Sequence, residues 1–463
     1  MRRYSIFSTV ICSMITCSLF FAGCGQKEDS SPVSITPDTP VSSDASVGDI
    51  EEPPALSPND SEITEELPPD TEEEDTVSDN SFFGYILSEE EALDPHVICK
   101  ETSEAGKATL LFTGDIALDD NWSNMAALRS RNGGIYDTLS PELMDRLNSA
   151  DICMVNNEFP YSDRGTPTPD KQFTFRASPS RVEILQQMGV DIVSLANNHA
   201  YDFGPDALMD TFSTLESANI PYVGAGRNIN EAMEPTYFIA GGQKIAYVSA
   251  TQIERYESPD TKEATEDSPG VLRTLNPERF LTVIENAEEN SDFVVVYVHW
   301  GSENTYDVEA SQRDLATAYI NAGADLIIGD HTHCLQGFEY INGVPVIYSL
   351  GNFWFNSKDL DTGMVEVSVC AGRLESLRFY PCRQHNCRTD LLLPGTDGEY
   401  ERVLGVMVSL SKDVSIDTEG YVSSGAGTGV EAVEPRPLKK PADPVTPSEN
   451  IILPEISANE IVQ

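Results

Sequence analysis

The chain has 463 residues, with 76 Asp and Glu against 29 Lys and Arg, which gives a formal net charge of −47. We expect so acidic a chain to bind no nucleic acid and no anionic lipid electrostatically, because those partners require a basic surface. Hydrophobic residues make up 40% of the chain, so a large part of it can fold around a core. The length suits two or three domains.

The first 23 residues predict a secretory signal peptide. Arg2 and Arg3 precede an uncharged, mostly apolar run, and the small residues Ala22 and Gly23 come directly before Cys24. The ending Phe-Ala-Gly-Cys resembles a bacterial lipobox, in which the cysteine becomes the site of lipid attachment. We therefore expect Cys24 to anchor the chain at the extracellular face of the bacterial cytoplasmic membrane. An uncleaved transmembrane helix is the alternative, since the apolar run is nearly long enough to span a bilayer.

Residues 24–104 are expected to form an acidic, Pro-rich, disordered stalk. Residues 25–80 alone contain 17 Asp and Glu, 8 Pro and one Lys, with few large apolar residues. Such a segment repels itself and buries too little apolar surface to offset the entropy lost on ordering. It carries −16 of the net charge, so about a third of the charge reflects tethering rather than chemistry.

Residues 105–390 show short runs of Val, Ile and Leu between longer mixed stretches, which predicts an α/β domain with largely parallel, buried strands. Strands are expected at 109–113, 152–155, 192–195, 245–249, 293–298, 326–328 and 344–349. Helices are expected at 141–148, 180–188, 205–218, 277–286 and 310–322. A C-terminal extension, 391–424, and a Pro-rich disordered tail, 425–463, are expected to follow.

Five of these strands are followed by carboxylate, carboxamide or imidazole side chains. In chain order the residues are Asp115, Asn156 and Glu158, Asn198 and His199, His299 and Glu303, and His331 and His333. Four of the six histidines in the chain belong to this set. In parallel sheets ligands bind beyond the carboxyl ends of the strands, and imidazole with carboxylate and carbonyl oxygen suits Mn, Zn or Fe. The sequence therefore predicts a site for one or two divalent ions.

Glu158 follows an apolar strand and would be a poorly solvated charge without a cation beside it. A carboxylate between two cations about 3.5 Å apart can bridge them, which suits an in-line displacement at phosphorus. His199, next to the candidate ligand Asn198, would then be free to act as a general acid toward a leaving oxygen. A hydrogen-bonded structural role is the alternative for any one of the histidines.

Six segments together resemble the CapA family, also called PgsA, of poly-γ-glutamate capsule proteins. They are TLLFTGDIALDD, VNNEFP, SLANNHAYDFG, VYVHWGSE, GDHTHCLQ and VIYSLGNFWF, which span residues 109–355 in the order of the family. The resemblance implies membership of the calcineurin-like metallophosphatase superfamily. The fold class it implies is α/β, with two β-sheets sandwiched between helices.

Carried over position by position, the resemblance implies two metal positions that share the carboxylate of Glu158. The first ion would be held by Asp115, Glu158 and His333, and the second by Glu158, Asn198, His299 and His331. His199 would be the catalytic histidine. Three further residues match family positions and would contact the substrate or support the ligands: Asn156, Asp202 and Glu303.

The first motif departs from the wider superfamily, where it reads Asp-x-His. Here the second residue after Asp115 is Ala117, so the first ion would lack a usual imidazole ligand. Asp119 or Asp120 would compensate, or the site would hold only one ion tightly. The CapA family commonly shares this departure, so the resemblance to that family stands.

Two functions follow from the resemblance. In the first, the protein assists the synthesis, export or anchoring of a capsule polymer of the poly-γ-glutamate type, together with capsule synthase components. In the second, it is an active metal-dependent hydrolase of phosphoesters or of the γ-glutamyl polymer. The family name favours the first function, and the complete ligand set favours retained metal chemistry.

An anionic polymer would be repelled by a chain of this charge unless bound metals or a basic patch oppose the repulsion. Lys171, Arg176 and Arg181 are the candidates for such a patch, with ordinary surface charges as the alternative. An exported compartment also permits disulfides. Cys382 and Cys387 are close enough in sequence to pair, and with His385 between them they form a weak candidate metal cluster.

Overall fold

The computed structural model describes residues 81–82, 84–253, 262–425, 427 and 429–438. They belong to one unit, residues 76–463, of the two into which the chain divides. The predicted signal peptide, Cys24 and most of the predicted stalk lie outside the described residues. Among the helices that are described, none is long and apolar enough to cross a membrane.

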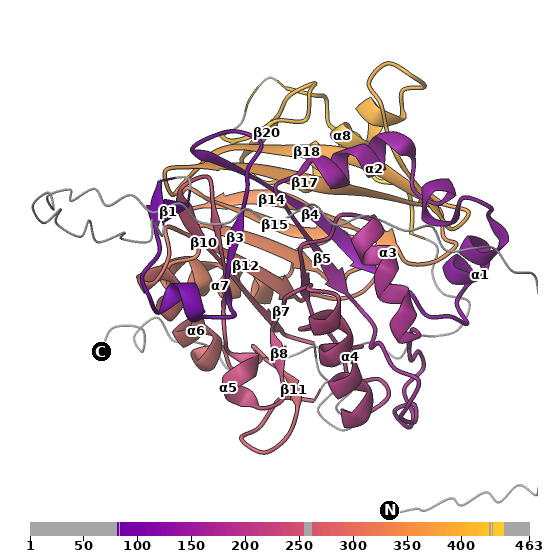
Figure 1. Ribbon diagram of the computed structural model, residues 1–463. Helices are drawn as coiled ribbons and strands as arrows, with labels where there is room; N and C mark the ends of the chain where they lie inside the picture. Colours follow the sequence, from indigo (N-terminus) through magenta and orange to yellow (C-terminus); the bar gives the residue numbers. More distant parts are fainter. Residues whose placement is uncertain (1–80, 83, 254–261, 426, 428, 439–463) are drawn as a thin grey trace, which may run out of the picture. The chain divides into compact units, whose positions relative to one another are not determined.

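Two β-sheets packed face to face form the centre of this unit (Figure 1). The first has seven strands, in the order β14 (Leu335–Ile341), β15 (Val344–Leu350), β13 (Leu326–Asp330), β12 (Phe293–His299), β10 (Gln243–Thr251), β9 (Thr236–Ala240) and β3 (Val97–Lys100). The second has the order β19 (Arg388–Leu391), β18 (Arg373–His385), β17 (Leu360–Cys370), β4 (Lys107–Ile116), β5 (Ile152–Asn157), β6 (Ile192–Ser194) and β7 (Tyr222–Val223), with β16 (Asn352–Trp354) pairing with β4 beside this path.

The strands that lead to the predicted site run parallel. In the second sheet β4, β5 and β6 are parallel neighbours, and in the first sheet β10, β12 and β13 are. Parallel neighbours bring their carboxyl ends to one edge of a sheet, which is where an open α/β sheet places its ligands. All seven predicted strands and all five predicted helices are present, with ends shifted by a few residues.

Alternation along the strands explains the layers. All seven residues of β12 are buried. Val295 and Tyr297 point into the core between the two sheets, whereas Val294, Val296 and Val298 point into the core beneath the outer helices. Because successive side chains of a strand point to opposite faces, a strand covered on both faces reads as one continuous apolar run.

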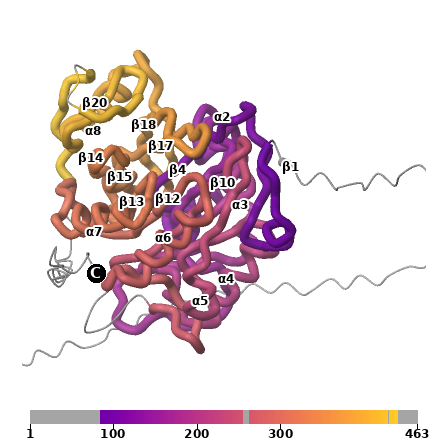
Figure 2. The backbone as a smooth tube through the Cα atoms, turned by 90° about the vertical axis from the view of Figure 1, so that its left-hand side faces the viewer, coloured from indigo at the N-terminus to yellow at the C-terminus, as the bar shows by residue number. Residues whose placement is uncertain are grey.

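Helices cover the outer face of each sheet (Figures 1 and 2). The outer core of the second sheet contains residues of α1 (Ser123–Ser130), α2 (Pro141–Ser149), α3 (Val182–Gln187) and α4 (Pro205–Ser217). The outer core of the first sheet contains residues of α5 (Ile229–Ala232), α6 (Glu278–Glu289) and α7 (Ala310–Asn321). This sandwich of two sheets between helices confirms the predicted α/β fold class.

The helix ends show local sequence signals. Ser140 caps α2 by accepting a hydrogen bond from the backbone N–H of Leu143, and Pro141 occupies the first turn. Glu309 and Gln312 form a capping box at the start of α7. The remaining elements are short: the strand pairs β1 (Ser81–Phe82) with β2 (Tyr85–Ile86), β8 (Ala225–Gly226) with β11 (Gly270–Val271), and β20 (Val414–Ile416) with β21 (Val422–Ser424), and the 3-10 helices η1 (Glu91–Leu93), η2 (Gly134–Asp137) and η3 (Pro179–Arg181).

The domain begins earlier than residue 105. β3 pairs in parallel with β9 as an edge strand of the first sheet, although the sequence places it in the stalk. Glu91 of η1 accepts a hydrogen bond from Lys244 Nζ at 2.7 Å, which fastens this segment to β10. The predicted end of the stalk at residue 104 is therefore too late, because charge dominates the composition there while the short strand β3 is still paired.

The predicted extension is part of the core. α8 (Glu399–Leu410) buries Tyr400, Val403, Leu404 and Met407 against the core between the two sheets. Figure 2 shows α8 at the same end of the sandwich as β14, β18 and β20. The helix therefore closes that end of the inter-sheet core.

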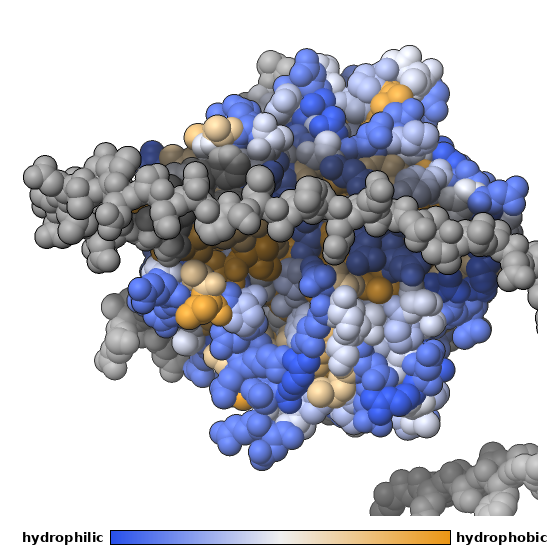
Figure 3. Space-filling view, viewed as in Figure 1, coloured by the Kyte–Doolittle hydropathy of each residue, from blue (hydrophilic) through white to orange (hydrophobic). Residues whose placement is uncertain are grey.

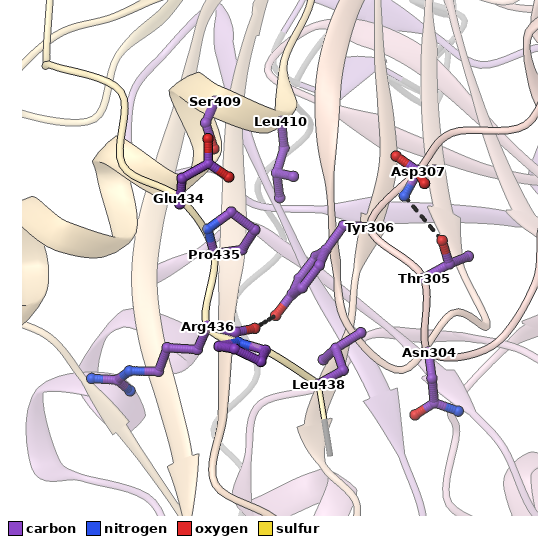
Figure 4. Close-up of a pocket in the computed structure, with 11 residues that line it drawn as sticks. Asn304, Thr305, Tyr306, Asp307, Ser409, Leu410, Glu434, Pro435, Arg436 and Leu438 are labelled. Atoms are coloured by element: carbon purple, nitrogen blue, oxygen red, sulfur yellow. Dashed lines mark hydrogen bonds between the residues drawn. The ribbon is translucent and has the colours of Figure 1, made fainter. Parts of the chain in front are cut away.

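The beginning of the predicted disordered tail also packs on the domain. Val433 N donates to Gly405 O of α8 at 2.8 Å, and Tyr306 Oη donates to Arg436 O at 2.9 Å (Figure 4). The guanidinium of Arg436 lies 2.6 Å from Glu399 Oε2. Residues 429–438 thus differ from the expectation of disorder, and residues 439–463 lie outside the described part of the chain.

The described surface seen in Figure 3 is mostly hydrophilic, with small, separate apolar patches. This agrees with the composition of the chain, of which 23% is charged. The chemistry is therefore to be sought among the buried polar residues.

Candidate metal centre

The carboxyl ends of five parallel strands, and the loops that follow them, bring the predicted site residues together. The residues that are at least nine-tenths buried are Asp115, Asn156, Glu158, Asn198, His199, Asp202, His299 and His331. They come from both sheets, so the site lies where the carboxyl ends of the two sets of strands meet. Two groups of side chains there are close enough to hold a metal ion: Glu158, His299 and His331, and Asp115, Glu158 and His333.

The second predicted metal position is centred on His299. Its Nε2 atom lies 2.9 Å from Asn198 Oδ1, 3.0 Å from His331 Nδ1 and 3.6 Å from Glu158 Oε1. Ligand atoms placed about 2.1 Å from a shared ion are about 3.0–3.5 Å apart in tetrahedral or octahedral coordination. The four side chains therefore have the spacing of a coordination group.

The first predicted metal position lies on the other side of Glu158. His333 Nδ1 is 3.4 Å from Asp115 Oδ2, and one carboxylate oxygen of Glu158 is within 4.8 Å of these ligand atoms. Glu158 belongs to both groups, as the bridging role requires.

Buried atoms without partners show that a divalent cation fits here. Asp115 Oδ2 and both carboxylate oxygens of Glu158 have no hydrogen-bond partner among the described residues. Burial, followed by the charges of Asp115 and Asp330, raises the pKa of Glu158 well above its usual value. Leaving a carboxylate buried and unpaired is costly, and coordination to a cation removes that cost.

The histidines in the second position are held neutral. Burial, together with the neighbouring His331 and His333, lowers the pKa of His299 well below its usual value. Burial also lowers the pKa of His331 to about 4. A neutral imidazole keeps the lone pair that a metal requires, so both rings are in the ligand form at neutral pH.

His333 differs from the other two rings. Burial acts to lower its pKa, but the carboxylates of Asp115, 3.4 Å away, and of Glu303 outweigh burial, and the pKa is raised. The backbone of His331 and His333 has φ angles of 97° and 58°, which few residues other than glycine adopt. Such strain occurs at functional sites, and here it turns the side chains of two nearby residues toward the two metal positions.

His199 stands beside the metal positions without belonging to either group. Its Nδ1 atom lies 2.7 Å from Asp202 Oδ2, and its Nε2 atom lies 3.9 Å from Glu158 Oε1. Asp202 also accepts hydrogen bonds from Lys171 Nζ at 2.6 Å and from the backbone N–H of Phe175 at 2.7 Å. Burial lowers the pKa of His199, while Asp202 acts in the opposite direction.

Asn156 supports a candidate ligand. Its Nδ2 atom donates to Asp115 Oδ1 at 2.7 Å and lies 3.3 Å from His299 Nδ1. Asn197, which the sequence did not single out for a role, donates to Asn156 Oδ1 at 3.0 Å and so sets the orientation of this carboxamide. The sequence offered one signal for Asn197, which is its position just after a strand.

Glu303 lies at the exposed rim of the site. Partial burial acts to raise its pKa, but the nearby His333 and His331 outweigh burial, and the pKa is lowered. Its carboxylate therefore carries a charge beside the metal positions, facing whatever enters from solvent.

Asp330 and Tyr297 were missed from the sequence. Asp330 is fully buried beneath the site, where its carboxylate accepts a hydrogen bond from Tyr297 Oη. Burial and the charge of Asp115 raise the pKa of Asp330 well above its usual value. Asp330 is the last residue of β13 and directly precedes His331. This position at a strand end could have identified it from the sequence.

The predicted compensation by Asp119 or Asp120 is wrong. Asp119 accepts hydrogen bonds from the backbone N–H groups of Asn121 and Arg176, each at 2.7 Å. Asp120 pairs with the guanidinium of Arg181 at 2.7 Å. Both carboxylates therefore stabilise local loops instead of the metal site.

The three cations of the predicted basic patch do not act together. Lys171 is buried beside Asp202, and Arg181 pairs with Asp120. The guanidinium of Arg176 lies over the ring of Phe203, 4.2 Å from its centre. The predicted patch is therefore not a free surface for an anion.

The cysteine predictions also differ from the structure. All six described cysteines are free, including Cys382 and Cys387. His385 Nε2 lies 2.7 Å from Asp390 Oδ2, which accounts for its position without a metal.

Residues 109–357 match the family described as bacterial capsule synthesis protein PGA_cap, and they make up more than half of the chain. The PGA biosynthesis protein CapA of Bacillus subtilis (strain 168) is 35% identical over 201 residues, which cover 42% of this chain and 52% of the relative. The capsule biosynthesis protein CapA of Bacillus anthracis is 31% identical over 268 residues, which cover 55% of this chain and 63% of the relative.

The matches therefore span between about half and two thirds of the length of these curated relatives. Among solved structures, a hypothetical protein from Thermus thermophilus has a TM-score of 0.36 and 16% identity, covering 60% of this chain and 99% of that chain. Since the family match covers more than half of the chain and includes every predicted metal ligand, the protein belongs to the bacterial capsule synthesis protein PGA_cap family.

Proposed function

We propose that the protein takes part in the synthesis, export or anchoring of a capsule polymer of the poly-γ-glutamate type, and that it does so with a divalent metal centre. Family membership and the names of the relatives support the polymer. The observation that carries the metal centre is the convergence of two ligand groups on the shared, fully buried Glu158. Capsule synthase components are the proposed protein partners.

The proposed location is the extracellular face of the bacterial cytoplasmic membrane, with Cys24 as the lipid attachment site. The signal-like segment before Cys24 and the acidic stalk after it support this location. Metabolic labelling with a fatty acid tests it. Label on the full chain that disappears in Cys24→Ser supports the anchor, and equal labelling of both chains contradicts it.

The metal ions, when bound, would supply a nucleophilic hydroxide near neutral pH and polarise the oxygen under attack. Asp115, Glu158, Asn198, His299, His331 and His333 would hold them. His199 is placed to handle a proton, because Nδ1–H can donate to Asp202 and leave Nε2 facing the site. Mn, Zn and Fe are the candidate metals.

Bound cations would also reconcile an acidic protein with an anionic polymer. Lys171 is buried and already paired, so its charge is not free to attract a polymer. Lys358 is exposed, and its charge acts on both Glu303 and His333 at the mouth of the site. Metal ions behind this lysine would reverse the local sign of the electrostatic field.

A second candidate function is an active hydrolase of phosphoesters or of the γ-glutamyl polymer. The pair formed by His199 and Asp202 favours it, because a site that only bound a polymer would have no need of an oriented proton donor. The two functions share one metal site and differ in whether a bond is broken.

One set of measurements separates these proposals. The purified full chain is analysed for bound metal, and its hydrolysis of a generic phosphodiester and of poly-γ-glutamate is assayed with and without Mn. His331→Ala is expected to lose metal, and His199→Ala is expected to keep metal and lose hydrolysis. A wild-type chain that binds no divalent metal overturns the metal centre.

The same variants are then examined in cells. A wild-type chain that binds metal and hydrolyses neither substrate favours the accessory function over the hydrolase. A capsule defect in His331→Ala cells, with the variant present at the normal level, then supports a role for the metal centre in capsule formation. Normal capsule in those cells contradicts that role.

A further inference from the structure

The first metal position has fewer nitrogen ligands than the second. Ala117, two residues after Asp115, offers no ligand atom, and Asp119 and Asp120 are bonded elsewhere. Three protein side chains, Asp115, Glu158 and His333, remain for this position. Divalent ions in such sites take at least four ligands, so a further protein ligand or water must complete the shell.

β16 brings one more oxygen to this position. Asn352 pairs in parallel register with Asp115 of β4. The two segments are in backbone contact, since Asp115 N donates to Gly351 O at 2.9 Å and a Cβ atom on Gly114 would lie only 1.8 Å from that oxygen. The approach of the two glycines therefore sets Asn352 beside Asp115.

The side chain of Asn352 is directed at the first position. The residue is fully buried, and its Oδ1 atom lies 2.8 Å from His333 Nδ1, the atom that is itself 3.4 Å from Asp115 Oδ2. Its Nδ2 atom has no hydrogen-bond partner in the described part of the chain. Within the described residues, no hydrogen bond of the amide NH2 group holds this side chain in place, and its oxygen is the end that faces the ligand atoms of the first position.

We propose that Asn352 Oδ1 is the fourth protein ligand of the first metal position, beside Asp115, Glu158 and His333. This inference rests on the metal centre of the proposed function. The separation of 3.4 Å falls within the spacing of about 3.0–3.5 Å between atoms that share one ion, and that of 2.8 Å is slightly shorter. The carboxamide oxygen of Asn352 would then coordinate the ion, as the carboxamide oxygen of Asn198 would in the second position.

The two positions then differ in chemistry. The first has three oxygen donors, from Asp115, Glu158 and Asn352, with a single imidazole. The second has two imidazoles, from His299 and His331, with two oxygen donors. Oxygen-rich sites suit Mn, and imidazole-rich sites suit Zn or Fe, so the first position favours Mn and the second favours Zn.

The competing role for Asn352 is to orient the ring of His333 by accepting a hydrogen bond from Nδ1. In that case His333 Nδ1 would carry a proton and be lost as a ligand. Replacement of Asn352 by histidine distinguishes the two roles, because a histidine can coordinate an ion in place of the carboxamide oxygen. It also adds a nitrogen ligand whose presence is visible in the absorption of bound Co²⁺.

The first experiment uses the full chain after removal of metal by a chelator. Calorimetric titration with Mn and with Zn, followed by elemental analysis, gives the number of ions and their affinities. Asn352→Leu is expected to lower the affinity of the Mn-preferring site by about 10–100-fold or more, since the loss of a residue that only supports a ligand already costs that much. The affinity of the Zn-preferring site should stay unchanged. Gln243→Leu is the matched control, since it removes a buried carboxamide at the opposite end of β10, about 25 Å away.

The outcomes separate this inference from the metal centre itself. A wild-type chain without bound metal overturns the metal centre and leaves no position for Asn352 to complete. Two bound ions with wild-type affinities in Asn352→Leu overturn the role of Asn352 alone. Loss of both ions in that variant overturns the assignment to one position.

The second experiment measures Co²⁺ absorption in Asn352→His. Recovery of two bound ions, with a changed Co²⁺ spectrum and a shift of the first position toward Zn, supports coordination by residue 352. A variant that resembles Asn352→Leu in both ion number and spectrum overturns coordination and leaves the orienting role. Unfolding curves recorded on every variant show whether a loss of metal reflects a loss of fold.

Discussion

Lys171 Nζ lies 2.6 Å from Asp202 Oδ1, and the two side chains are only 3% and 0% exposed. The other oxygen of Asp202 receives Nδ1 of His199. Lys171 also donates to the backbone carbonyl of Asn198 at 2.5 Å. A buried ion pair therefore holds both the candidate proton donor and the backbone of a candidate metal ligand.

Replacing Lys171 by methionine is expected to destabilise the fold strongly. The change removes one partner of a buried ion pair and leaves the carboxylate of Asp202 uncompensated, which costs about 3–5 kcal/mol. Denaturant unfolding of the full chain measures the difference. The control is Lys358→Met at an exposed lysine, where a change within about 0.5 kcal/mol is expected. Equal stability of the two variants would show that Asp202 does not depend on Lys171.

Asp202→Asn tests the orientation of His199. The carboxamide keeps the shape of the side chain but has no negative charge to hold Nδ1–H of His199. Asp202 would then no longer control whether Nε2 carries a proton. In a preparation that hydrolyses a phosphodiester, we expect kcat to fall about 10²–10⁴-fold, the usual contribution of acid–base catalysis. Bound metal, measured by elemental analysis, should stay at the wild-type level. An unchanged kcat would exclude His199 from proton transfer.

The predictable part of the site is the part that follows parallel strands. Asp115, Glu158, Asn198, His299 and His331 each come one to three residues after an apolar run, so strand geometry alone gathers them at one edge. The sequence also predicted the strands themselves, since strands buried on both faces are continuous apolar runs.

Other relationships depend on contacts between distant segments. Asn352 reaches the first metal position only because β16 crosses to pair with β4, and Lys171 reaches Asp202 from a loop with no regular structure. β17 and β18 have mixed polar and apolar residues, so their long antiparallel pair was not recognised from apolar runs. No local pattern encodes such pairings, because they are determined by tertiary packing.

Gly114→Ala is expected to separate β4 from β16. The new Cβ atom would lie 1.8 Å from the carbonyl oxygen of Gly351, so the backbones must move apart. Overpacking of this kind typically costs about 1–3 kcal/mol. Because Asp115 and Asn352 follow these two glycines, affinity for the ion in the first position should fall together with stability.

Gly343→Ala provides the comparison for that variant. Gly343 has a φ of 89° and no atom within 4 Å of an added Cβ, so only backbone strain of about 1 kcal/mol is expected. Metal titration and denaturant unfolding are recorded for both variants. Normal metal binding in Gly114→Ala would contradict the tie between the contact of these strands and the first position.

Truncation tests the packing of residues 429–438. A chain that ends at residue 428 loses the bond from Val433 to Gly405 and the bond from Tyr306 to Arg436. We expect the free energy of unfolding to fall by about 1–3 kcal/mol, since a net hydrogen bond is worth about 1 kcal/mol. Proteolysis near Tyr306 should become faster, because that loop loses its contact with the tail. A chain that ends at residue 438 keeps these contacts and should match the full chain in both measurements.

Asp325 gives a pH dependence of stability. Its Oδ2 atom accepts a hydrogen bond from the backbone N–H of Val294 at 2.9 Å, but burial raises its pKa to about 6, with a further contribution from Glu288. The folded state therefore holds a proton between the ordinary pKa near 4 and about 6, whereas the unfolded state has released it. The contribution of this carboxyl to stability is fully present below pH 4 and is lost as the pH rises to 6.

Asp325→Asn is expected to remove this loss, since the neutral carboxamide oxygen still accepts from Val294. At pH 7.5 the variant should be more stable than the wild type by about 1–3 kcal/mol, because one pKa unit corresponds to about 1.4 kcal/mol. At pH 4 the two proteins should be equally stable. Urea unfolding at pH 4, 5, 6 and 7.5 measures the difference. A difference that does not grow between pH 4 and pH 6 would show that Asp325 is ionised alike in the folded and unfolded states.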